Sequence, residues 1–577
     1  MNKHWKGDLQ MSKYMIIDGN RVDFDNEKNI LQVVKKAGIH LPTFCYYSDL
    51  SIYGACRMCV VEDQWGGIIA SCSTPPKDKM IIKTNTPKLH QHRKMILELL
   101  LASHCGDCKV CEKNGSCRLQ LLAGRFGLKE VRFSQDQPKH EIDKSSKSIV
   151  RNPNKCILCG DCVRVCNEVQ NVGAIGVANR GAKMVVSPAF NKKLAETDCV
   201  NCGQCAAVCP TAAITITKST KEVWKAIYDP TKRVVVQVAP AVRVAIGEAF
   251  GLNPGKNTIG KIFKAMRMLG FDQVFDTSLG ADLTIIEEAG ELVKKLDQGD
   301  NKYPLFTSCC PAWIRYAETK HPELMPYISS CKSPMEMFGA VLKEHFKSAD
   351  EKEEKETISV AVMPCAAKKS EAARAEFIRN GRPDVDYVIT TNELIHMIKE
   401  EGIQFTEIEP EAPDMPFSIA SGSGVIFGAT GGVTEAALRK VVADKTNQSL
   451  QAIEYSGVRG YEGIKTAEIA LGEKTVRIAV VSGLGNAEKV IKQIQSGEEH
   501  FDFVEVMACP GGCIAGAGQP FSHKPEKLNR TAGLYKADKT SVIKRSEENP
   551  VVTQLYNDGL LKGREHELLH VKYERTV

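Results

Sequence analysis

The spacing of hydrophobic and polar positions changes along the chain. Residues 14–24 hold two short apolar runs around an Asp-Gly-Asn turn, which predicts a pair of short strands. Residues 29–38 follow with helical spacing and end at a glycine, and residues 88–104 form a longer helical stretch. Cysteines interrupt the pattern after each of these segments. The N-terminal part therefore predicts short strands and single helices separated by groups of cysteines.

From about residue 220 the pattern becomes an alternation of strands and helices. Short runs rich in β-branched residues lie at 234–238, 358–363, 387–390, 477–481 and 503–507, with amphipathic stretches of helical length between them. This order predicts an α/β architecture with largely parallel sheets. The polar segment 134–147 indicates a linker, and the charge-dense run 349–357 indicates a solvated loop or helix end.

Composition places the chain among large globular proteins. It has 577 residues, of which 43% are hydrophobic, enough for several domains with their own cores. No apolar stretch approaches 18 residues and residues 1–10 are polar, so we expect neither a membrane span nor a signal peptide. The net charge of +6 is mild and indicates a mixed solvated surface, although a basic patch that docks an acidic carrier is the alternative. No basic-aromatic stripe indicates a nucleic-acid partner.

The 22 cysteines change this picture. A disulfide scaffold suits small secreted domains, whereas tight Cys-x2-Cys-x2-Cys spacing in a large chain favours metal ligation in a reducing cytoplasm. Three thiolates spaced in this way can surround one face of an iron–sulfur cubane, and a fourth crosses to a partner cluster. Two runs of identical spacing predict such a pair of clusters, and hence a path for electrons: Cys156, Cys159, Cys162 and Cys166, then Cys199, Cys202, Cys205 and Cys209.

Two further groups lie nearer the N-terminus. One follows the first strands and helix, an order typical of a small ferredoxin domain, although its ten-residue gap departs from the four-residue gap of plant-type ferredoxins: Cys45, Cys56, Cys59 and Cys72. The other is a histidine followed by four cysteines: His104, Cys105, Cys108, Cys111 and Cys117.

The remaining cysteines of interest follow strands of the C-terminal part. Cys309 and Cys310 come after the run 304–308, Cys365 follows the strand ending at Met363, and Cys509 follows the strand ending at 507. In open α/β sheets, ligands bind at the carboxyl ends of the strands. Thiolates delivered to one crevice in this way predict another cubane site inside the large domain.

Four segments in this region carry a family resemblance. They read FTSCCPAW at 306–313, MPCAAKKSE at 363–371, FGATGGV at 427–433 and MACPGGCIAG at 507–516. Together, and behind the cysteine series, they resemble the signature set of [FeFe] hydrogenases, specifically the monomeric clostridial type with four accessory iron–sulfur clusters.

The resemblance implies a multidomain fold that combines α/β and α+β parts. The expected domains are a β-grasp [2Fe–2S] ferredoxin-like domain at 1–89, a [4Fe–4S] domain with one histidine and three cysteine ligands and a linker at 90–147, a two-[4Fe–4S] ferredoxin domain at 148–219, and a large α/β catalytic domain with parallel or mixed sheets at 220–577. In the family, a C-terminal tail such as the helix-forming segment 530–577 wraps around the catalytic domain.

The resemblance also implies an H-cluster, a [4Fe–4S] cubane joined to a diiron unit that carries CO, cyanide and a bridging dithiolate. Its reaction is the reversible formation of H2 from protons and electrons. The implied cubane ligands are Cys310, Cys365, Cys509 and Cys513, with Cys513 as the bridging thiolate. The implied walls of the diiron pocket are Ala239, Pro240, Met363, Phe427 and Met507, for which core packing is the compatible alternative. Dedicated maturation proteins must supply the diiron unit.

The same resemblance assigns the accessory clusters. Cys45, Cys56, Cys59 and Cys72 would hold a [2Fe–2S] cluster. His104, Cys108, Cys111 and Cys117 would hold a [4Fe–4S] cluster, although spacing leaves Cys105 open as a replacement for the histidine. Cys156, Cys159, Cys162 and Cys209 would hold one further cubane, and Cys199, Cys202, Cys205 and Cys166 the other. Asn167 stands where proline often follows the fourth cysteine.

A proton relay is the third implied feature. Cys309 would be the inner proton donor, and Glu288, Ser329 and Glu291 would continue the relay to the surface. From the residues alone, two carboxylates three positions apart indicate an ordinary helix face. The resemblance favours the relay instead, because groups within hydrogen-bond reach are needed to carry protons into a dry site.

Several single positions outside these groups also have an expected role. Lys368 is expected to contact a cyanide ligand, and its neighbour Lys369 to be a surface residue. Lys295 and Ala241 stand where relatives have arginine and serine, respectively, and arginine's planar fork is lost at the first. Cys331 is expected to be a small buried apolar residue. The Gly-Leu-Gly at 483–485 indicates a tight strand–helix turn and not a dinucleotide site.

We therefore expect a cytoplasmic [FeFe] hydrogenase that exchanges electrons with a ferredoxin or a flavodoxin-type carrier. One alternative is the electron-input subunit of a respiratory NADH dehydrogenase, which should lack the Cys-Cys-Pro and Cys-Pro-Gly-Gly-Cys motifs. The other is a non-catalytic relative, either a hydrogen sensor or an iron–sulfur assembly factor. Within the family, sensors typically lose the proton-relay cysteine and assembly-type relatives do not keep the full diiron pocket. Retention of Cys309, Glu288 and Glu291 therefore argues for turnover.

Overall fold

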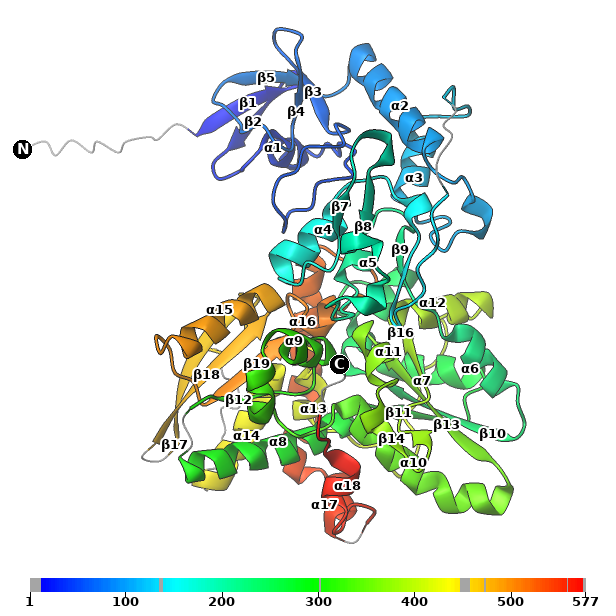
Figure 1. The fold of residues 1–577 in the computed structure, drawn as a ribbon, viewed down its shortest axis with the longest axis vertical. Coiled ribbons are helices and arrows are strands. Elements are labelled where there is room, and N and C mark those ends of the chain that lie inside the picture. Colours follow the sequence, from blue (N-terminus) through cyan, green and yellow to red (C-terminus); the bar gives the residue numbers. More distant parts are fainter. Residues whose placement is uncertain are drawn as a thin grey trace, which may run out of the picture.

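The computed structural model describes residues 12–133, 139–299, 302–446, 457–471, 474–557 and 559–573. The polar N-terminus at 1–10 and part of the expected linker therefore lie outside the described residues. A small N-terminal domain lies at one end of the molecule, a segment with short helices and strands joins it to the rest, and a large two-sheet body forms the other end (Figure 1). No helix among the described residues is long and apolar enough to cross a membrane.

The N-terminal domain is a mixed five-stranded sheet with one helix, which confirms the expected β-grasp class. Strands β1 (Lys13–Ile17) and β2 (Asn20–Phe24) form the hairpin around Asp18 and Gly19, both with positive φ as a tight right-twisting turn requires. The strand order is β2-β1-β5-β3-β4, with β3 at Val60–Asp63, β4 at Ile68–Ala70 and β5 at Met80–Lys83. Helix α1 (Ile30–Lys36) covers it, capped by the Asn29 side chain.

Helix α2 (Pro87–Ala102) joins this sheet to the next segment. It begins at Thr86, whose hydroxyl caps Leu89 N–H. The buried Arg93 guanidinium donates to the carbonyls of three residues of the N-terminal domain, Met58, Val60 and Thr84. A short turn (Cys108–Val110) and helix α3 (Arg118–Arg125) follow. The three hydrogen bonds of Arg93 hold α2 against the β-grasp sheet.

The two cysteine runs, which have the same spacing, also fold in the same way. Strands β6 (Ile149–Arg151) and β9 (Ile214–Ile216) pair, as do β7 (Gly176–Ala178) and β8 (Val185–Ser187). Each cysteine run turns through a left-handed glycine, Gly160 (φ 76°) or Gly203 (φ 74°), into helix α4 (Asp161–Arg164) or α5 (Gln204–Val208). The strand expected directly after Cys209 is β9.

The large domain contains two four-stranded sheets. The first is all parallel, in the order β11-β10-β13-β16, with β10 at Lys232–Val238, β11 at Gln273–Asp276, β13 at Glu356–Met363 and β16 at Tyr387–Thr390. The second has the order β12-β19-β18-β17, with β12 at Leu305–Phe306, β17 at Ile464–Leu471, β18 at Lys474–Ser482 and β19 at Phe503–Met507. Only β17 runs antiparallel there. The sequence pattern missed β11 and β17, whereas β12 lies within the run 304–308 that precedes Cys309.

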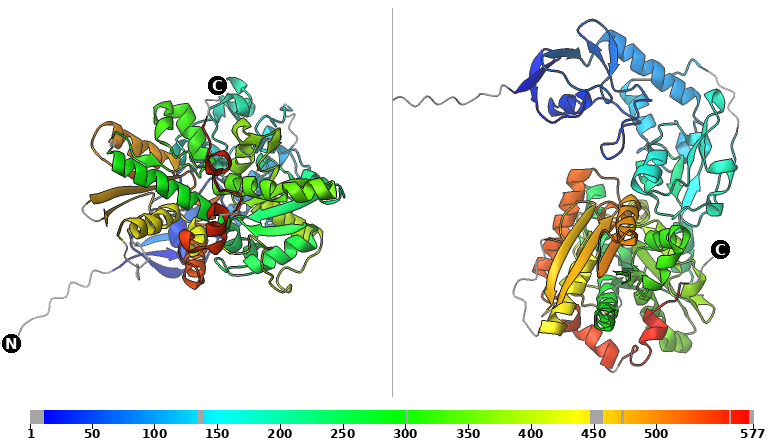
Figure 2. Two further views of the ribbon diagram at one scale, coloured as in Figure 1. Left: turned by 90° about the horizontal axis from the view of Figure 1, so that it is seen from below. Right: turned by 60° about the vertical axis from the view of Figure 1, so that its left-hand side comes forward.

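Helices lie between and around the two sheets (Figures 1 and 2). Helix α8 (Ser278–Gln298) packs against α10 (Pro334–Glu353), α13 (Gly422–Ile426) and α14 (Gly432–Thr446). A Cβ at Gly280 would lie 2.3 Å from the Pro334 carbonyl oxygen, so glycine is needed for this close helix contact. The run 349–357 is the end of α10 and the start of β13, as expected of a helix end.

Further helices complete the sequence of elements. Those that cover the sheets are α6 (Thr220–Ile227), α7 (Ile259–Met268), α9 (Pro311–Lys320), α11 (Ala367–Glu371), α12 (Thr391–Glu400) and α15 (Leu484–Gln495). Two strands of two residues each, β14 (Ile378–Arg379) and β15 (Arg382–Pro383), form a short hairpin. The glycine at 483 has φ 87° and begins α15, which confirms the strand–helix turn.

The C-terminal segment crosses the large domain. Its helices are α16 (Lys524–Thr540), α17 (Pro550–Asn557) and α18 (Glu565–Leu569). Asp282 of α8 is fully buried and accepts hydrogen bonds from Ser546 and Asn549 in this segment, as well as from Ser421. Beyond α18, the segment forms an antiparallel bridge between His570 and Cys331.

Arg530 on α16 binds the C-terminal segment to the rest of the large domain. Its fully buried guanidinium forms a two-bond ion pair with Glu248, both at 2.7 Å, and donates to the carbonyls of Ile514 and Pro520. We expect Arg530→Leu to lower the free energy of unfolding by about 3–5 kcal/mol, because the carboxylate and two carbonyls lose a charged donor. Urea unfolding followed by circular dichroism measures this loss.

The matched control is Lys536→Leu, an exposed position on the same helix, which should change the stability by less than about 0.5 kcal/mol. Equal effects of the two substitutions would contradict the role of the Arg530 ion pair.

Candidate functional site

Three strands deliver cysteines to one place in the large domain. Cys310 follows β12 and precedes helix α9, Cys365 follows β13, and Cys509 follows β19. Cys513 comes after two glycines, Gly511 (φ 94°) and Gly512 (φ 86°), whose left-handed backbone turns the chain back. A Cβ at Gly512 would lie 2.6 Å from the Thr430 nitrogen, so a side chain there would displace the loop.

These cysteines line one cavity of about 80 Å³ between the two sheets. Its wall is mostly apolar and contains every residue that the sequence assigned to the diiron pocket: Ala239, Pro240, Met363, Phe427 and Met507. The cysteines that face it are Cys309, Cys310, Cys365, Cys509 and Cys513. The structure therefore brings together residues from five distant parts of the sequence.

The donor set matches what an iron–sulfur cubane requires. Burial raises the pKa of Cys310, and it raises the pKa of Cys365 to about 11, so these thiols hold their protons until a metal replaces them. Two of the sulfurs also receive N–H donors, Cys310 from Ala508 at 3.5 Å and Cys509 from the Gln204 amide at 3.1 Å. Hydrogen bonds to ligand sulfurs are one means by which proteins set the potential of a cluster.

Cys309 and Glu288 form the buried inner part of the expected relay. Glu288 lies on α8, is 1% exposed, and accepts a hydrogen bond from Ser308 N–H at 3.4 Å. Burial, followed by repulsion from Glu291, raises the pKa of Glu288 to about 8. Burial, followed by the charge of Glu288, raises the pKa of the Cys309 thiol well above its usual range. Both groups therefore carry protons at neutral pH.

The outer part of the relay differs in one contact from the sequence expectation. Ser329 accepts a hydrogen bond from Cys331 N–H at 3.2 Å and contributes a hydrogen bond to Glu288. Glu291, however, accepts from both the backbone N–H (3.1 Å) and the hydroxyl of Ser330, the next residue. Ser330 in turn lies 2.7 Å from His570 Nδ1. Adjacent serines were a weak signal for Ser330, whereas nothing in the sequence indicated His570.

The two neighbouring lysines are both buried, so the expectation of a surface Lys369 is wrong. Lys368 lines the cavity, where its ammonium pairs with Glu371 at 2.7 Å and donates to the Cys309 carbonyl at 3.3 Å. Lys369 points the other way and pairs with Glu393 at 3.0 Å. Lys369 itself is only 7% exposed. Helix α11 separates them because consecutive side chains on a helix face different directions.

Three other positions singled out in the sequence are also placed by the structure. Lys295 lies 5.5 Å above the Tyr327 ring near the end of α8. Ala241 is buried beside the cavity, and its carbonyl accepts from Gln519. Cys331 is fully buried, as expected.

The first accessory cysteine group converges in the N-terminal domain. Cys56 N–H donates to the Cys45 sulfur at 3.3 Å, and Phe44 N–H donates to the Cys56 sulfur at 3.5 Å. Cys59 and Cys72 are hydrogen-bonded to each other, and the pKa of Cys59 falls to about 7 because Cys72 donates to it. Backbone donors around closely spaced sulfurs suit a [2Fe–2S] centre.

The histidine of the second group is better placed as a ligand than its cysteine neighbour. His104 Nε2 is buried and has no hydrogen-bond partner among the described residues, while Cys105 is exposed. Cys117 is buried and Cys108 and Cys111 are partly so. A buried ring nitrogen without a protein partner is what a metal ligand requires, because its lone pair must be left for the metal.

The repeated runs cross over as spacing indicated. One cavity is lined by Cys156, Cys159, Cys162 and Cys209. Burial raises the pKa of Cys205 well above its usual range, and Cys202, Cys199 and Cys166 act in the same direction, as does Cys162 of the other group, so Cys205 lies near cysteines of both runs. Gln204, between two of these cysteines, reaches Cys509 of the large domain, so the second group lies beside the central cavity.

Comparison with known proteins decides the family. Residues 232–517 match the C-terminal domain of the large subunit of iron-only hydrogenases, and residues 524–576 match the iron hydrogenase small subunit. The chain is 37% identical to iron hydrogenase 1 of Clostridium pasteurianum, over 98% of this chain and 100% of that protein. The chain belongs to the [FeFe] hydrogenases.

Other matches extend the likeness of this hydrogenase to its N-terminal part. Residues 15–87 match a 2Fe-2S cluster-binding domain, 93–132 an iron–sulfur binding region of NADH-ubiquinone oxidoreductase G, and 155–213 a 4Fe-4S dicluster domain. The chain is 44% identical to an NADP-reducing hydrogenase subunit of Solidesulfovibrio fructosivorans, over 96% of this chain and 98% of that protein.

Solved structures agree with the assignment. An apo [FeFe]-hydrogenase from Chlamydomonas reinhardtii shares 41% identity with a TM-score of 0.55, covering 62% of this chain and 99% of that chain. An assembly relative also matches, the cytosolic iron–sulfur assembly component 3 of Mus musculus, at 30% identity over 66% of this chain and 84% of that protein. The complete apolar pocket beside Cys309 and Glu288 favours a hydrogenase over an assembly factor.

The ligand choice at the second accessory group can be tested directly. We expect His104→Ala to remove or alter the EPR signal of one accessory cluster, because a buried ring nitrogen without another partner is lost. Cys105→Ala is the matched control and should leave the spectrum unchanged. The reverse pattern would assign the ligand to Cys105.

Proposed function

We propose that this hydrogenase conducts electrons through one [2Fe–2S] and three accessory [4Fe–4S] clusters to an H-cluster in the cavity of the large domain. The H-cluster, when bound, supplies the metal site at which protons and electrons combine reversibly into H2. The chain's own residues hold the clusters, exclude water and move protons. The ligand groups are those of the sequence assignment, with His104 in the second.

The proposed ligands of the H-cluster cubane are Cys310, Cys365, Cys509 and Cys513. They are supported by their convergence on one mostly apolar cavity and by N–H donors to Cys310 and Cys509. Lys368 is proposed to bind an anionic ligand of the diiron unit, because its buried ammonium lines the same cavity. The diiron unit itself requires maturation proteins, since side chains cannot supply CO and cyanide.

Proton movement is the step for which the protein's own groups carry the chemistry. Cys309 holds a proton at its sulfur beside the cavity, and Glu288 holds one at its carboxyl behind it. Ser329 hydrogen-bonds to Glu288, and Glu291 lies one helical turn farther along α8 with its carboxyl partly exposed. We propose that protons pass among these four groups, and the observation that carries this is the burial of the Glu288 carboxyl next to Cys309, where it accepts from Ser308 N–H.

The electron partner is proposed to be a ferredoxin or flavodoxin-type carrier that docks near the N-terminal clusters. A second possibility has its own support, because the similar Solidesulfovibrio protein is named a subunit of an NADP-reducing hydrogenase. A partner subunit would then supply the nicotinamide site. A cytoplasmic location is proposed because cysteines that hold clusters must stay out of disulfides, which a reducing compartment favours.

Removal of the inner thiol tests the relay. We expect Cys309→Ala to lower H2 evolution by a factor on the order of 10²–10⁴, the typical contribution of a positioned proton donor. Gas chromatography with a reduced dye as electron donor measures the rate. Infrared bands of CO and cyanide, together with iron content, serve as the control and should match those of the wild type. Wild-type turnover in a fully assembled variant would remove Cys309 from the relay.

The raised pKa of Glu288 makes a separate prediction about stability. The folded protein holds this proton up to about pH 8, whereas an ordinary glutamate with pKa 4.5 loses it earlier. Wild-type stability therefore falls as pH rises from about 4.5 to about 8, by an amount of order 5 kcal/mol from this group. Glu288→Gln removes that slope and also lowers turnover.

The measurement is the thermal midpoint of both proteins at several pH values. The variant should gain on the wild type steadily across this range and gain no more above it. Parallel curves would show that the carboxyl is not held protonated by the fold.

A further inference from the structure

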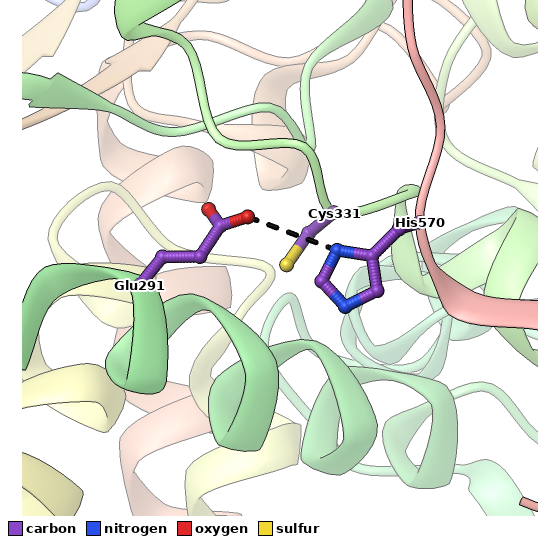
Figure 3. A group of neighbouring side chains, drawn as sticks. All are labelled: Glu291, Cys331 and His570. Atoms are coloured by element: carbon purple, nitrogen blue, oxygen red, sulfur yellow. Dashed lines mark ion pairs between the residues drawn. The ribbon is translucent and has the colours of Figure 1, made fainter. Parts of the chain in front are cut away.

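A group of three different ligand types lies at the outer end of the proposed relay. Glu291 on α8, Cys331 after Ser330, and His570 beyond α18 offer one carboxylate oxygen, one sulfur and one ring nitrogen, all within 4.8 Å of one another. Figure 3 shows the three side chains pointing toward one another, with the ion pair between Glu291 and His570 dashed. We refer to these three residues as the outer triad.

The backbone fixes the triad. Residues 330–332 pair with the C-terminal segment through Lys332 N–H to the Leu569 carbonyl and Val571 N–H to the Ser330 carbonyl, both at 2.8 Å. This antiparallel bridge places Cys331 opposite His570. The ion pair of Lys332 with Asp384 at 2.7 Å, both buried, holds the same strand from its other side. The cysteine and the histidine therefore have little freedom to separate.

The distances approach those of a tetrahedral metal site. Zinc binds nitrogen and oxygen at about 2.0–2.1 Å and sulfur at about 2.3 Å, so neighbouring ligands lie about 3.3–3.6 Å apart. His570 Nδ1 is 3.7 Å from a Glu291 oxygen, and the Cys331 sulfur lies within 4.8 Å of a ligand atom of each of these two residues. The hydroxyl of Ser330 is hydrogen-bonded to both Glu291 and His570, which holds these two side chains together.

Electrostatics also favours a cation here. His570 lies between two carboxylates of α8, with Glu287 at 3.1 Å from Nε2 and Glu291 at 3.7 Å from Nδ1. The second oxygen of Glu291 is buried without a hydrogen-bond partner within the described part of the chain. The side chains of His570 and Glu291 keep 9% and 20% of their surface exposed, so the triad is reachable from solvent while Cys331 is fully buried.

We propose that the outer triad of Glu291, Cys331 and His570 binds a thiophilic divalent cation of the Zn²⁺ class and that its occupation stops hydrogen turnover. A mixed thiolate, imidazole and carboxylate set suits zinc. A cation on Glu291 occupies the oxygen that the outermost relay step needs. This second half of the proposal rests on the proposed relay, and the cation site itself does not.

The test adds Zn²⁺ alone to the cluster-loaded, tag-free protein under anaerobic conditions. Zinc bound after dialysis is measured by mass spectrometry, and its ligands by X-ray absorption at the zinc edge, where iron does not interfere. We expect one zinc per chain with one sulfur at about 2.3 Å and nitrogen or oxygen ligands at about 2.0–2.1 Å. H2 evolution should fall at least tenfold and recover on chelation, with iron content unchanged.

Three variants sharpen the result. Cys331→Ala should remove the sulfur from the zinc spectrum, and His570→Gln should weaken zinc binding at least tenfold. If the histidine variant fails to fold, the smaller change at Cys331 still tests the site. His500→Gln is the matched control, since this exposed histidine near Asp502 is another imidazole–carboxylate pair at the surface. It should bind zinc as the wild type does.

The outcomes separate the two halves. Zinc without a sulfur ligand, or bound equally by all variants, overturns the cation site while the loss of turnover in Cys309→Ala leaves the relay intact. Zinc held by the triad with full H2 evolution overturns the inhibition and removes Glu291 from the relay, while the cation site stands.

Discussion

The structure depends on a single constraint, the burial of sulfur ligands at the carboxyl ends of parallel strands. A thiol there is dry, and its raised pKa makes the empty site unfavourable to ionise. An iron–sulfur cluster resolves this, since metal replaces the protons. Glycines in the Cys-Pro-Gly-Gly-Cys turn and close helix contacts such as that of Gly280 exist because the backbone must approach this cavity closely.

The same burial controls proton chemistry. Glu288 is held neutral because α8 places it in the core with Glu291 one turn away, and both effects act in the same direction. A carboxyl that keeps its proton near neutral pH can both give and take one, which an exposed glutamate cannot do as readily. The acidic face of α8 is therefore not an ordinary solvated helix face, although its sequence resembles one.

The C-terminal segment is more than a cover for the large domain. It contributes Arg530 to the core near the cysteine loop, two polar partners to Asp282, and His570 as a partner of Ser330 beside Glu291. Its contacts reach α8 at both its buried start and its exposed end. The position of the acidic groups on α8 thus depends on residues far away in the chain.

The sequence by itself determined the cysteine groups, the family and most strands of the large domain. Fixed spacing imposes fixed loop geometry, and β-branched runs in parallel sheets are buried on both faces, so both signals are local. The edge strand β17 and the burial of Lys369 were decided only by the tertiary structure. So were the Ser330 contact to Glu291, the Gln204 bond to Cys509 and the arrival of His570 at α8. Each of these features either joins residues that are distant in sequence or depends on which side of a helix faces the core. A local sequence pattern contains no information about either.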